Sequence, residues 1–281
     1  MEKFQLVQPS RLLRSYVKQY WFLTIDNAER SSQRYVPSGC AVLAFHRGDK
    51  IYSTLHQEMQ PRSSLCGQSV SYTDVVYSGN LNLVMVVFQP VAARVVLGIP
   101  MNNLRDKNVD VELLGDASLI ELEKWIMETE DNNQCVYLIE QYLLKKLYGF
   151  TSERFARMNA VVQSINNGQQ DITELSQSAC LGYKQFKRVF AEYTGLNPKE
   201  FLQIARFRNA LHCLHAGSQI RLNQLAYDWG YCDKSHLIKD FKTFMGYTPK
   251  EYLSICDSYS EYLSFNSVFI NGERETKSNR L

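Results

Sequence analysis

The feature that most constrains the fold is an internal repeat in the C-terminal half of the chain. Shifting the sequence by 51 positions aligns the string YKQFKRVFAEYTGLNPKEFL, which begins at Tyr183, with KSHLIKDFKTFMGYTPKEYL, which begins at Lys234. Just upstream the shift is 50, so the second copy has one extra residue in its turn. A repeated sequence indicates a repeated structural unit. The chain therefore holds two copies of one small unit.

Each copy predicts a helix, a tight turn and a second helix. In the first copy Asp171 precedes an apolar helical pattern with Glu174 three residues later, which is a helix-start signature of the capping-box kind. The turn falls at residues 180–182, a second helix spans about 183–193, and Gly195 ends it.

The second copy repeats this plan. Its turn lies at residues 230–232, Asp233 caps a helix that runs to about Phe244, and Gly246 ends it. Between the copies, apolar residues at steps of 3, 3, 4 and 3 predict one helix of about 17 residues from Pro198, ended by Gly217. Its length is about 25 Å at the α-helical rise. A stiff helix thus separates the two units.

The second helix of each unit carries polar and basic side chains opposite its apolar face, and the major groove of DNA admits one such helix. Side chains expected at base edges are Lys184, Gln185, Lys187 and Arg188 in the first unit, and Lys234, Ser235, His236, Ile238 and Lys239 in the second. Lys242 is expected at a phosphate. In one helix alone these cations would more simply be a solvated face, but the same placement in both copies favours DNA.

Net charge adds little to this choice. Residues 160–255 hold 11 Lys and Arg against 8 Asp and Glu, while residues 1–159 hold 17 of each. An excess of three is too small to establish a nucleic-acid partner.

These strings resemble the two helix-turn-helix modules of the AraC/XylS family. The resemblance rests on LSQSACLGYKQFKRVF from Leu175, GLNPKEF from Gly195, RFRNAL from Arg206, LAYDWGYCDKSHLIKDF from Leu225 and GYTPKEY from Gly246. It implies a transcription regulator, usually an activator, that reads two successive major-groove segments and contacts RNA polymerase. The chain departs from the family at Ser176, Cys180 and Gly182, where alanine, glycine and serine are usual. A cysteine in a turn that needs positive φ costs about 1 kcal/mol.

The N-terminal part has short segments rich in Val, Leu, Tyr and Phe, at residues 16–25, 41–45 and 83–88, and helical patterns at 119–127 and 136–147. We therefore expect an α+β protein: a β-barrel domain with helices over residues 1–150, an all-α, homeodomain-like double helix-turn-helix domain over 151–255, and a tail over 256–281. Strings such as RYVPSGCAVLAF resemble an N-terminal domain of unassigned ligand on some AraC-type regulators. That resemblance implies a cupin-like barrel that senses a signal or dimerises.

Other expectations concern partners and chemistry. The aromatic residues Tyr20, Trp21, Phe22, Phe45 and Phe88 are expected in the core rather than around a ligand. The apolar stripe over 136–147 could pack on its own barrel or form a homodimer. No catalytic or phosphate-loop motif and no cysteine pairing pattern appears, so we expect no enzyme, no cofactor and no metal. The absence of a signal or membrane-spanning pattern predicts a cytoplasmic protein without a membrane partner. The partners expected are double-stranded DNA, RNA polymerase and an unidentified small-molecule effector.

Overall fold

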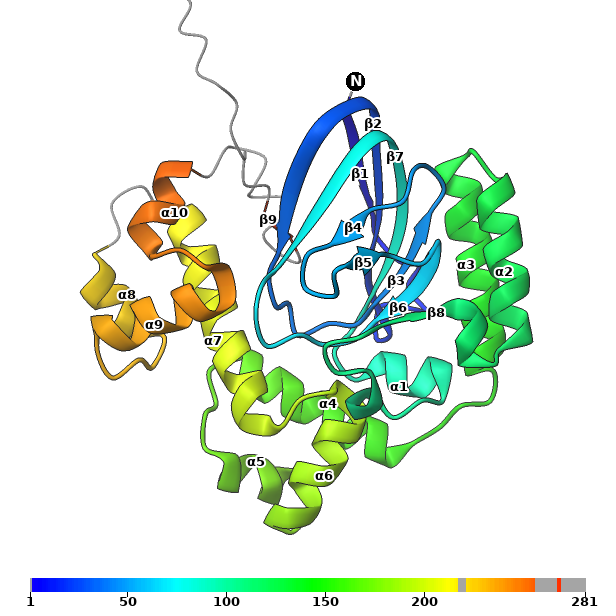
Figure 1. Ribbon diagram of the computed structural model, residues 1–281. Coiled ribbons are helices and arrows are strands. Elements are labelled where there is room, and N and C mark those ends of the chain that lie inside the picture. Colours follow the sequence, from blue (N-terminus) through cyan, green and yellow to red (C-terminus); the bar gives the residue numbers. More distant parts are fainter. Residues whose placement is uncertain (1, 217–220, 256–266, 269–281) are drawn as a thin grey trace, which may run out of the picture.

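The computed structural model describes residues 2–216, 221–255 and 267–268. A curved antiparallel sheet with flanking helices comes first along the chain, and an all-helical region follows (Figure 1). The strands are β1 (Glu2–Val7), β2 (Val17–Tyr35), β3 (Val42–His46), β4 (Tyr52–Ser53), β5 (Glu58–Met59), β6 (Ser63–Cys66), β7 (Thr73–Phe88), β8 (Asn108–Asp110) and β9 (Ser267–Val268).

The helices of the N-terminal part are α1 (Ala92–Leu97), α2 (Ala117–Glu128) and α3 (Asn132–Leu147), with 3-10 turns η1 (Met101–Leu104) and η2 (Val111–Leu114). Those of the C-terminal part are α4 (Glu153–Asn166), α5 (Ile172–Ser178), α6 (Tyr183–Thr194), α7 (Pro198–Ala216), α8 (Leu222–Asp228), α9 (Lys234–Met245) and α10 (Pro249–Ile255). Of the helices that the structure describes, none has the length and apolar character needed to cross a membrane. The expected tail over 256–281 lies outside the described residues except for β9.

The sheet follows the order β1-β2-β7-β3-β6-β8, with β4 and β5 added beside β7. All of its pairings are antiparallel. The expected cupin-like sheet is present, but the expectation of a closed barrel is wrong. Within the described part of the chain the edge strands β1 and β8 do not pair with each other. Because β8 has three residues and runs directly into η2, it offers little backbone for a further strand.

Residue alternation along each strand gives the sheet two buried faces. Tyr20, Phe22 and Phe45 point to one face and pack with the helices α2 and α3. Trp21 points to the other face, with Ala44 and Met85 of the neighbouring strands. All five aromatic side chains are buried in apolar clusters, as expected, although Trp21 lies in a separate cluster on the opposite face and also lines a cavity. Adjacent strand positions cannot share a face.

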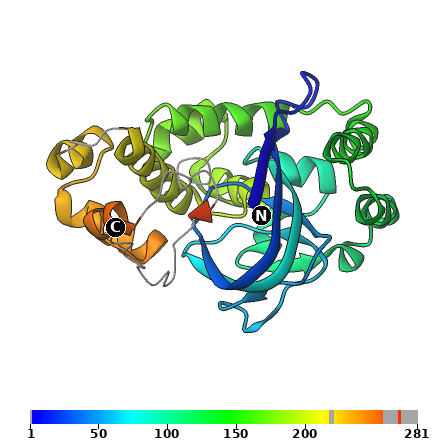
Figure 2. The same ribbon diagram turned by 90° about the horizontal axis from the view of Figure 1, so that it is seen from above.

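Helices α2 and α3 cover the outer face of the sheet. Ile139 and Leu143, two members of the apolar stripe expected over 136–147, are fully buried and pack with the sheet residues Phe22 and Val84. This part of the stripe therefore stabilises its own domain. In both views α2 and α3 lie at the opposite end of the molecule from α8 and α9, with the sheet between (Figures 1 and 2).

The helical region has its own core, but that core extends into the N-terminal part. Phe186, Phe190 and Phe207 are fully buried at its centre. Val36, which directly follows β2, and Ala92 from α1 belong to the same apolar cluster. The two parts of the chain are thus packed against each other through apolar surface as well as joined by the short segment between α3 and α4.

Candidate nucleic-acid interface

The first module consists of α5, the turn over residues 179–182 and α6. Asp171 caps α5, since its carboxylate accepts hydrogen bonds from the backbone N–H of Thr173 (2.7 Å) and Glu174 (3.3 Å). The expected reciprocal bond from the Glu174 carboxylate is not the one observed, because Gln169 instead accepts from the Asp171 N–H at 2.9 Å. Gly195 ends α6 with φ of 85°. The helix boundaries follow the caps that the sequence contains.

The turn of the first module contains a strained residue. Cys180 has φ of 54°, in the left-handed region that favours glycine. The corresponding turn of the second module has Gly230 with φ of 70°. The strain predicted from the sequence at Cys180 is therefore present. Gly182, at the N-cap of α6, makes no side-chain capping bond, as its missing side chain requires.

The second module consists of α8, a turn over residues 229–233 and α9. This turn is one residue longer than the first, as the repeat alignment predicted. Asp233 caps α9 by accepting a 2.8 Å hydrogen bond from the N–H of His236. Gly246 ends α9 with φ of 79°. Arg221, at the start of α8, makes no side-chain capping bond.

Helix α7 joins the modules. A reciprocal capping box fixes its start: Asn197 accepts from the Glu200 N–H at 3.1 Å, and Glu200 accepts from the Asn197 N–H at 3.0 Å. The helix has 19 residues, close to the 17 expected, and is about 28 Å long. Its residues Phe201, Ile204 and Phe207 are buried in the shared core. It is therefore held on both modules along its length.

The structure places most of the predicted DNA-contacting side chains on two exposed helix faces. Phe186, Val189 and Phe190 form the buried face of α6, and Leu237 and Phe241 that of α9. The exposed members of the predicted set are Lys184, Gln185, Lys187, Arg188, Lys234, Ser235, Lys239 and Lys242, whereas His236 and Ile238 are half-buried. Both second helices thus present cations to solvent, and at one pair of equivalent positions, Arg188 and Lys239, both modules carry a cation.

Two of these side chains have partners within the protein. Arg188, 64% exposed, forms a 2.8 Å ion pair with Glu192 one turn along α6. The His236 ring lies edge-on to Tyr231, and its Nε2 lies 3.2 Å from Arg206. Arg188 can exchange its partner for DNA at little cost because exposed ion pairs are weak, whereas His236 is more constrained.

A buried ion pair inside the second module was not predicted from the sequence. Arg206 of α7 donates to Asp240 of α9 at 3.0 Å, and both side chains are largely buried. Arg206 also lies 4.3 Å above the ring of Tyr231, whose pKa is raised by burial. The sequence did contain a signal for this pair. Asp240 lies on the apolar face of α9, between Leu237 and Phe241, and a carboxylate at such a position indicates a buried cationic partner. This pair fixes α9 on the connecting helix.

The N-terminal domain holds the second module through Arg34 of β2. The guanidinium group forms two 2.6 Å hydrogen bonds with Asp74 and donates at 2.9 Å to the carbonyl of Met245 at the end of α9. It lies between the rings of Tyr72 and Tyr247, at 4.0 and 4.9 Å from their centres. A cation at a helix C-terminus is also favoured by the helix dipole. We call this group of five residues the Arg34 clamp.

Further contacts hold α4 and α7 on the N-terminal domain, and α6 of the first module lies against α1 and η1. Arg105 pairs with Glu200 at 2.8 Å, and Arg208 donates to the Ser38 carbonyl at 2.8 Å. The rings of Tyr16 and Phe155 are stacked with centres 5.2 Å apart. Both modules are therefore fixed relative to the sheet, on surfaces away from the exposed cations of α6 and α9.

Comparison with known proteins finds matches to both parts of the chain. Residues 175–255 match a family described as helix-turn-helix domain, and residues 5–110 match a domain of unknown function (DUF6597). An HTH-type transcriptional regulator from Haemophilus influenzae, named as uncharacterized, is 25% identical over 135 residues, which are 46% of this chain and 45% of the relative. The aligned part thus spans about half the length of that relative.

The fold is also similar to solved structures of ToxT from Vibrio cholerae O395. One crystal structure gives a TM-score of 0.44 at 14% identity, covering 86% of this chain and 98% of ToxT. ToxT bound to (E)-4-(8-methylnaphthalen-1-yl)but-3-enoic acid gives 0.45 at 13% identity, covering 89% and 98%.

The two equivalent modules agree with the match of residues 175–255 to a helix-turn-helix domain. The chain thus carries a helix-turn-helix domain of two modules with a β-rich domain ahead of it, and its sequence strings are similar to those of the AraC/XylS family.

Proposed function

We propose that this protein is a sequence-specific DNA-binding transcription regulator that places α6 and α9 in two successive major-groove segments. The observation that carries the proposal is the repeated exposure of cations opposite a buried face on both helices. A solvated surface does not require that the same helix of both modules carries exposed cations, with Arg188 and Lys239 at equivalent positions. Residues 151–255 would be the DNA-binding unit and residues 1–150 the regulatory unit. We propose that the protein acts in the cytoplasm by binding DNA and not as an enzyme.

The connecting helix sets the spacing of the two contacts. Successive major-groove segments on one face of DNA lie about 34 Å apart. Helix α7 is about 28 Å long, and side chains at both ends add reach. The buried pair between Arg206 and Asp240 resists rotation of α9 about α7. A single protomer could therefore contact both segments with fixed spacing.

The exposed side chains divide into two expected classes. Lys184, Gln185, Lys187 and Arg188 lie in the first half of α6, the part that usually approaches base edges. Ser235, His236, Ile238 and Lys239 take the same places on α9, and Lys234 precedes them at the start of that helix. Ile238 suits a thymine methyl group. Lys242, near the C-terminal end of α9, is proposed to contact a phosphate.

Substitution of single side chains tests this division. Arg188→Ala is expected to weaken binding to the selected site by about 10- to 100-fold and to relax preference at one base pair, as expected for loss of a bidentate guanine contact. Lys242→Ala should weaken binding evenly across sequences and reduce the salt dependence. The matched control is Lys145→Ala, which removes an exposed cation from α3 at the far end of the molecule. Equal, sequence-independent losses for Arg188 and Lys242 would show that neither reads a base.

For the regulatory partners we propose only the class of partner and the surface it would use. We propose contact with RNA polymerase, as the family resemblance implies, and control by the N-terminal domain through the Arg34 clamp. For a homodimer we propose the outer face of the α2–α3 pair, where Trp125 and Tyr137 are each about half exposed, because Ile139 and Leu143 of the inner stripe are already buried. Sedimentation of the full chain with Trp125→Ala tests this: a wild-type dimer that dissociates supports it, and a wild-type monomer rejects it.

A further inference from the structure

His236, near the start of α9, is held on two sides by the protein itself. Its Nε2 atom lies 3.2 Å from Nη2 of Arg206. Its ring is perpendicular to that of Tyr231, with the ring centres 5.3 Å apart. The side chain is half-buried, whereas the neighbouring Lys234 and Ser235 are exposed. The imidazole ring therefore has a defined orientation before any DNA is bound.

Arg206 of α7 is also fixed in place. It donates from Nη2 to Asp240 at 3.0 Å and from Nη1 to the Gly230 carbonyl at 3.3 Å, and it lies over the Tyr231 ring. Its side chain is only 14% exposed. Arginine stays protonated in proteins and has five N–H donors but no acceptor. The contact with His236 therefore has one possible direction, with Arg206 as the donor and Nε2 as the acceptor.

The direction of this contact determines which ring nitrogen carries the proton. Nε2 accepts a hydrogen bond only when it has no proton, and in a neutral ring the proton then lies on Nδ1. Among the described residues His236 Nδ1 has no hydrogen-bond partner, and it is not one of their fully buried unpartnered atoms. His236 thus offers a single N–H donor to a molecule outside the protein.

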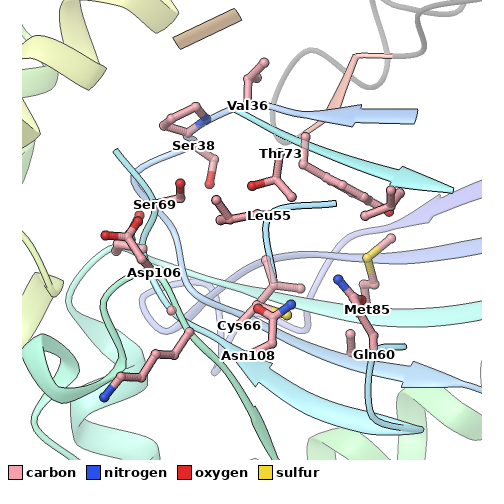
Figure 3. Close-up of a pocket in the computed structure, with 18 of the residues that line it drawn as sticks. Val36, Ser38, Leu55, Gln60, Cys66, Ser69, Thr73, Met85, Asp106 and Asn108 are labelled. Atoms are coloured by element: carbon pink, nitrogen blue, oxygen red, sulfur yellow. The ribbon is translucent and has the colours of Figure 1, made fainter. Parts of the chain in front are cut away.

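His56 of the N-terminal domain has the opposite arrangement. Its Nε2 lies 2.9 Å from the Asp106 carbonyl oxygen, which can only accept, and its Nδ1 lies 3.0 Å from the Ser53 hydroxyl. The proton of a neutral His56 ring therefore lies on Nε2. His56 lines the cavity of the N-terminal sheet beside Asp106, which is labelled in Figure 3. This histidine serves as an internal reference for His236.

The first module has a different residue at the equivalent position. Shifting by 51 positions aligns His236 with Gln185, which is exposed. An amide side chain has both a donor and an acceptor, so Gln185 can match either kind of base edge. A fixed imidazole N–H cannot. In the major groove guanine presents two acceptors and no donor, whereas cytosine presents only a donor. A single N–H donor therefore suits guanine and rejects cytosine.

We propose that Arg206 is a positioning residue that holds His236 as an Nδ1–H donor, and that this donor contacts a guanine edge in the second groove segment. The contact with guanine rests on the proposed function, whereas the fixed position of the proton does not. Because Arg206 also pairs with Asp240, one guanidinium group fixes α9 on the connecting helix and sets the hydrogen-bonding character of the α9 surface.

NMR of the full chain with nitrogen-15-labelled histidine measures the proton position directly, at about pH 8, where histidine is ordinarily neutral. Ring nitrogens with and without a proton differ strongly in chemical shift, and a freely solvated ring favours the proton on Nε2. The signals of His236 are those absent from His236→Asn. They should show the proton on Nδ1, while those of His56 show it on Nε2. A proton on Nε2 of His236 would overturn the proposal.

A double substitution tests whether Arg206 is the cause. Arg206→Met combined with Asp240→Leu removes both charges, and such a replacement of a buried ion pair is often neutral for stability. Circular dichroism verifies that the variant is folded, and the wild-type measurement does not depend on it. The His236 proton should move to Nε2, as in a solvated ring, while His56 is unchanged. If the His236 proton stays on Nδ1, Arg206 does not position it.

DNA binding tests the contact with guanine. At the base pair whose preference is relaxed in His236→Ala, the wild-type protein should select guanine. It should bind about tenfold more weakly when that pair is reversed, because the cytosine amino group then faces the imidazole N–H. His236→Asn should keep this preference, since its amide N–H can take the place of Nδ1–H. His236→Gln should lose it, because the longer side chain carries its amide past that position.

The outcomes separate the two ideas. The guanine contact is wrong if no base-pair preference depends on His236, if reversal of the pair has no effect, or if His236→Gln selects guanine as well as His236→Asn does. Arg188→Ala on the same DNA is the reference for the first module. If it too changes no preference, the proposed function fails together with the guanine contact, while the NMR result still decides the proton position.

Discussion

Replacing Cys180 with glycine should stabilise the protein, although it removes a side chain. The φ of 54° at this position costs a residue with a Cβ atom about 1 to 2 kcal/mol. Glycine removes that strain but adds about 0.4 to 1 kcal/mol of backbone entropy to the unfolded chain. The Cys180 side chain is exposed, so its loss costs little packing. The expected net gain in the free energy of unfolding is about 0.5 to 1 kcal/mol.

The assay is urea unfolding followed by circular dichroism under reducing conditions. The slope of the unfolding free energy against urea concentration should be the same in every variant, which checks two-state behaviour. Cys180→Ala is the matched control, because it removes the thiol but keeps the Cβ atom, and it should be nearly neutral. Gly230→Ala makes the opposite change in the second module, where φ is 70°, and it should destabilise by about 0.5 to 1 kcal/mol. If Cys180→Gly is no more stable than Cys180→Ala, backbone strain at this turn is not the cause.

Two further predictions concern the N-terminal domain. Arg34→Met should lower the free energy of unfolding by about 2 kcal/mol and increase amide exchange in α9, because it leaves Asp74 unpaired and releases the end of that helix; the exposed Arg11→Met is the control, and unchanged exchange in α9 would contradict a clamp. For His46, the folded-state pKa of about 4 lies below the ordinary 6.5, so its unfolded form binds a proton first as the pH falls. The contribution of the neutral ring to the free energy of unfolding is complete above pH 6.5 and is lost as the pH falls. Between pH 6.5 and pH 4 the free energy of unfolding should therefore fall by about 3 kcal/mol more in the wild type than in His46→Gln. Parallel pH profiles for the two proteins would reject a neutral buried ring.

Local sequence signals were sufficient for the helical region. Asp171, Asp233, Gly195 and Gly246 mark the ends of their helices because capping and left-handed turns depend on neighbouring residues alone. Buried faces at a period near 3.6 residues placed Phe186 and its equivalents in the core. The predicted DNA-contacting residues are mostly exposed as expected, but their contacts with DNA stay predictions.

Features that depend on distant residues were not predicted. The Arg34 clamp joins residues more than 200 positions apart, and no periodic pattern encodes such a pairing. Trp21 is buried as expected, but the sequence pattern assigned it to no face, and strand alternation turns it away from Tyr20 and Phe22. The open sheet edge at β8 also depends on strand order, which the sequence pattern does not specify.

Insertion of five base pairs between the two halves of a selected DNA site tests the central claim most directly. If α6 and α9 read two major-groove segments joined by the stiff α7, the wild-type site should show two protected blocks about ten base pairs apart in footprinting. Five extra base pairs rotate one block to the opposite face of the duplex, and affinity should fall towards the non-specific level. Insertion of ten base pairs restores the face but lengthens the span by about 34 Å, beyond the reach of one protomer. A single protected block, or undiminished affinity after the five-base-pair insertion, would contradict the paired-module mechanism.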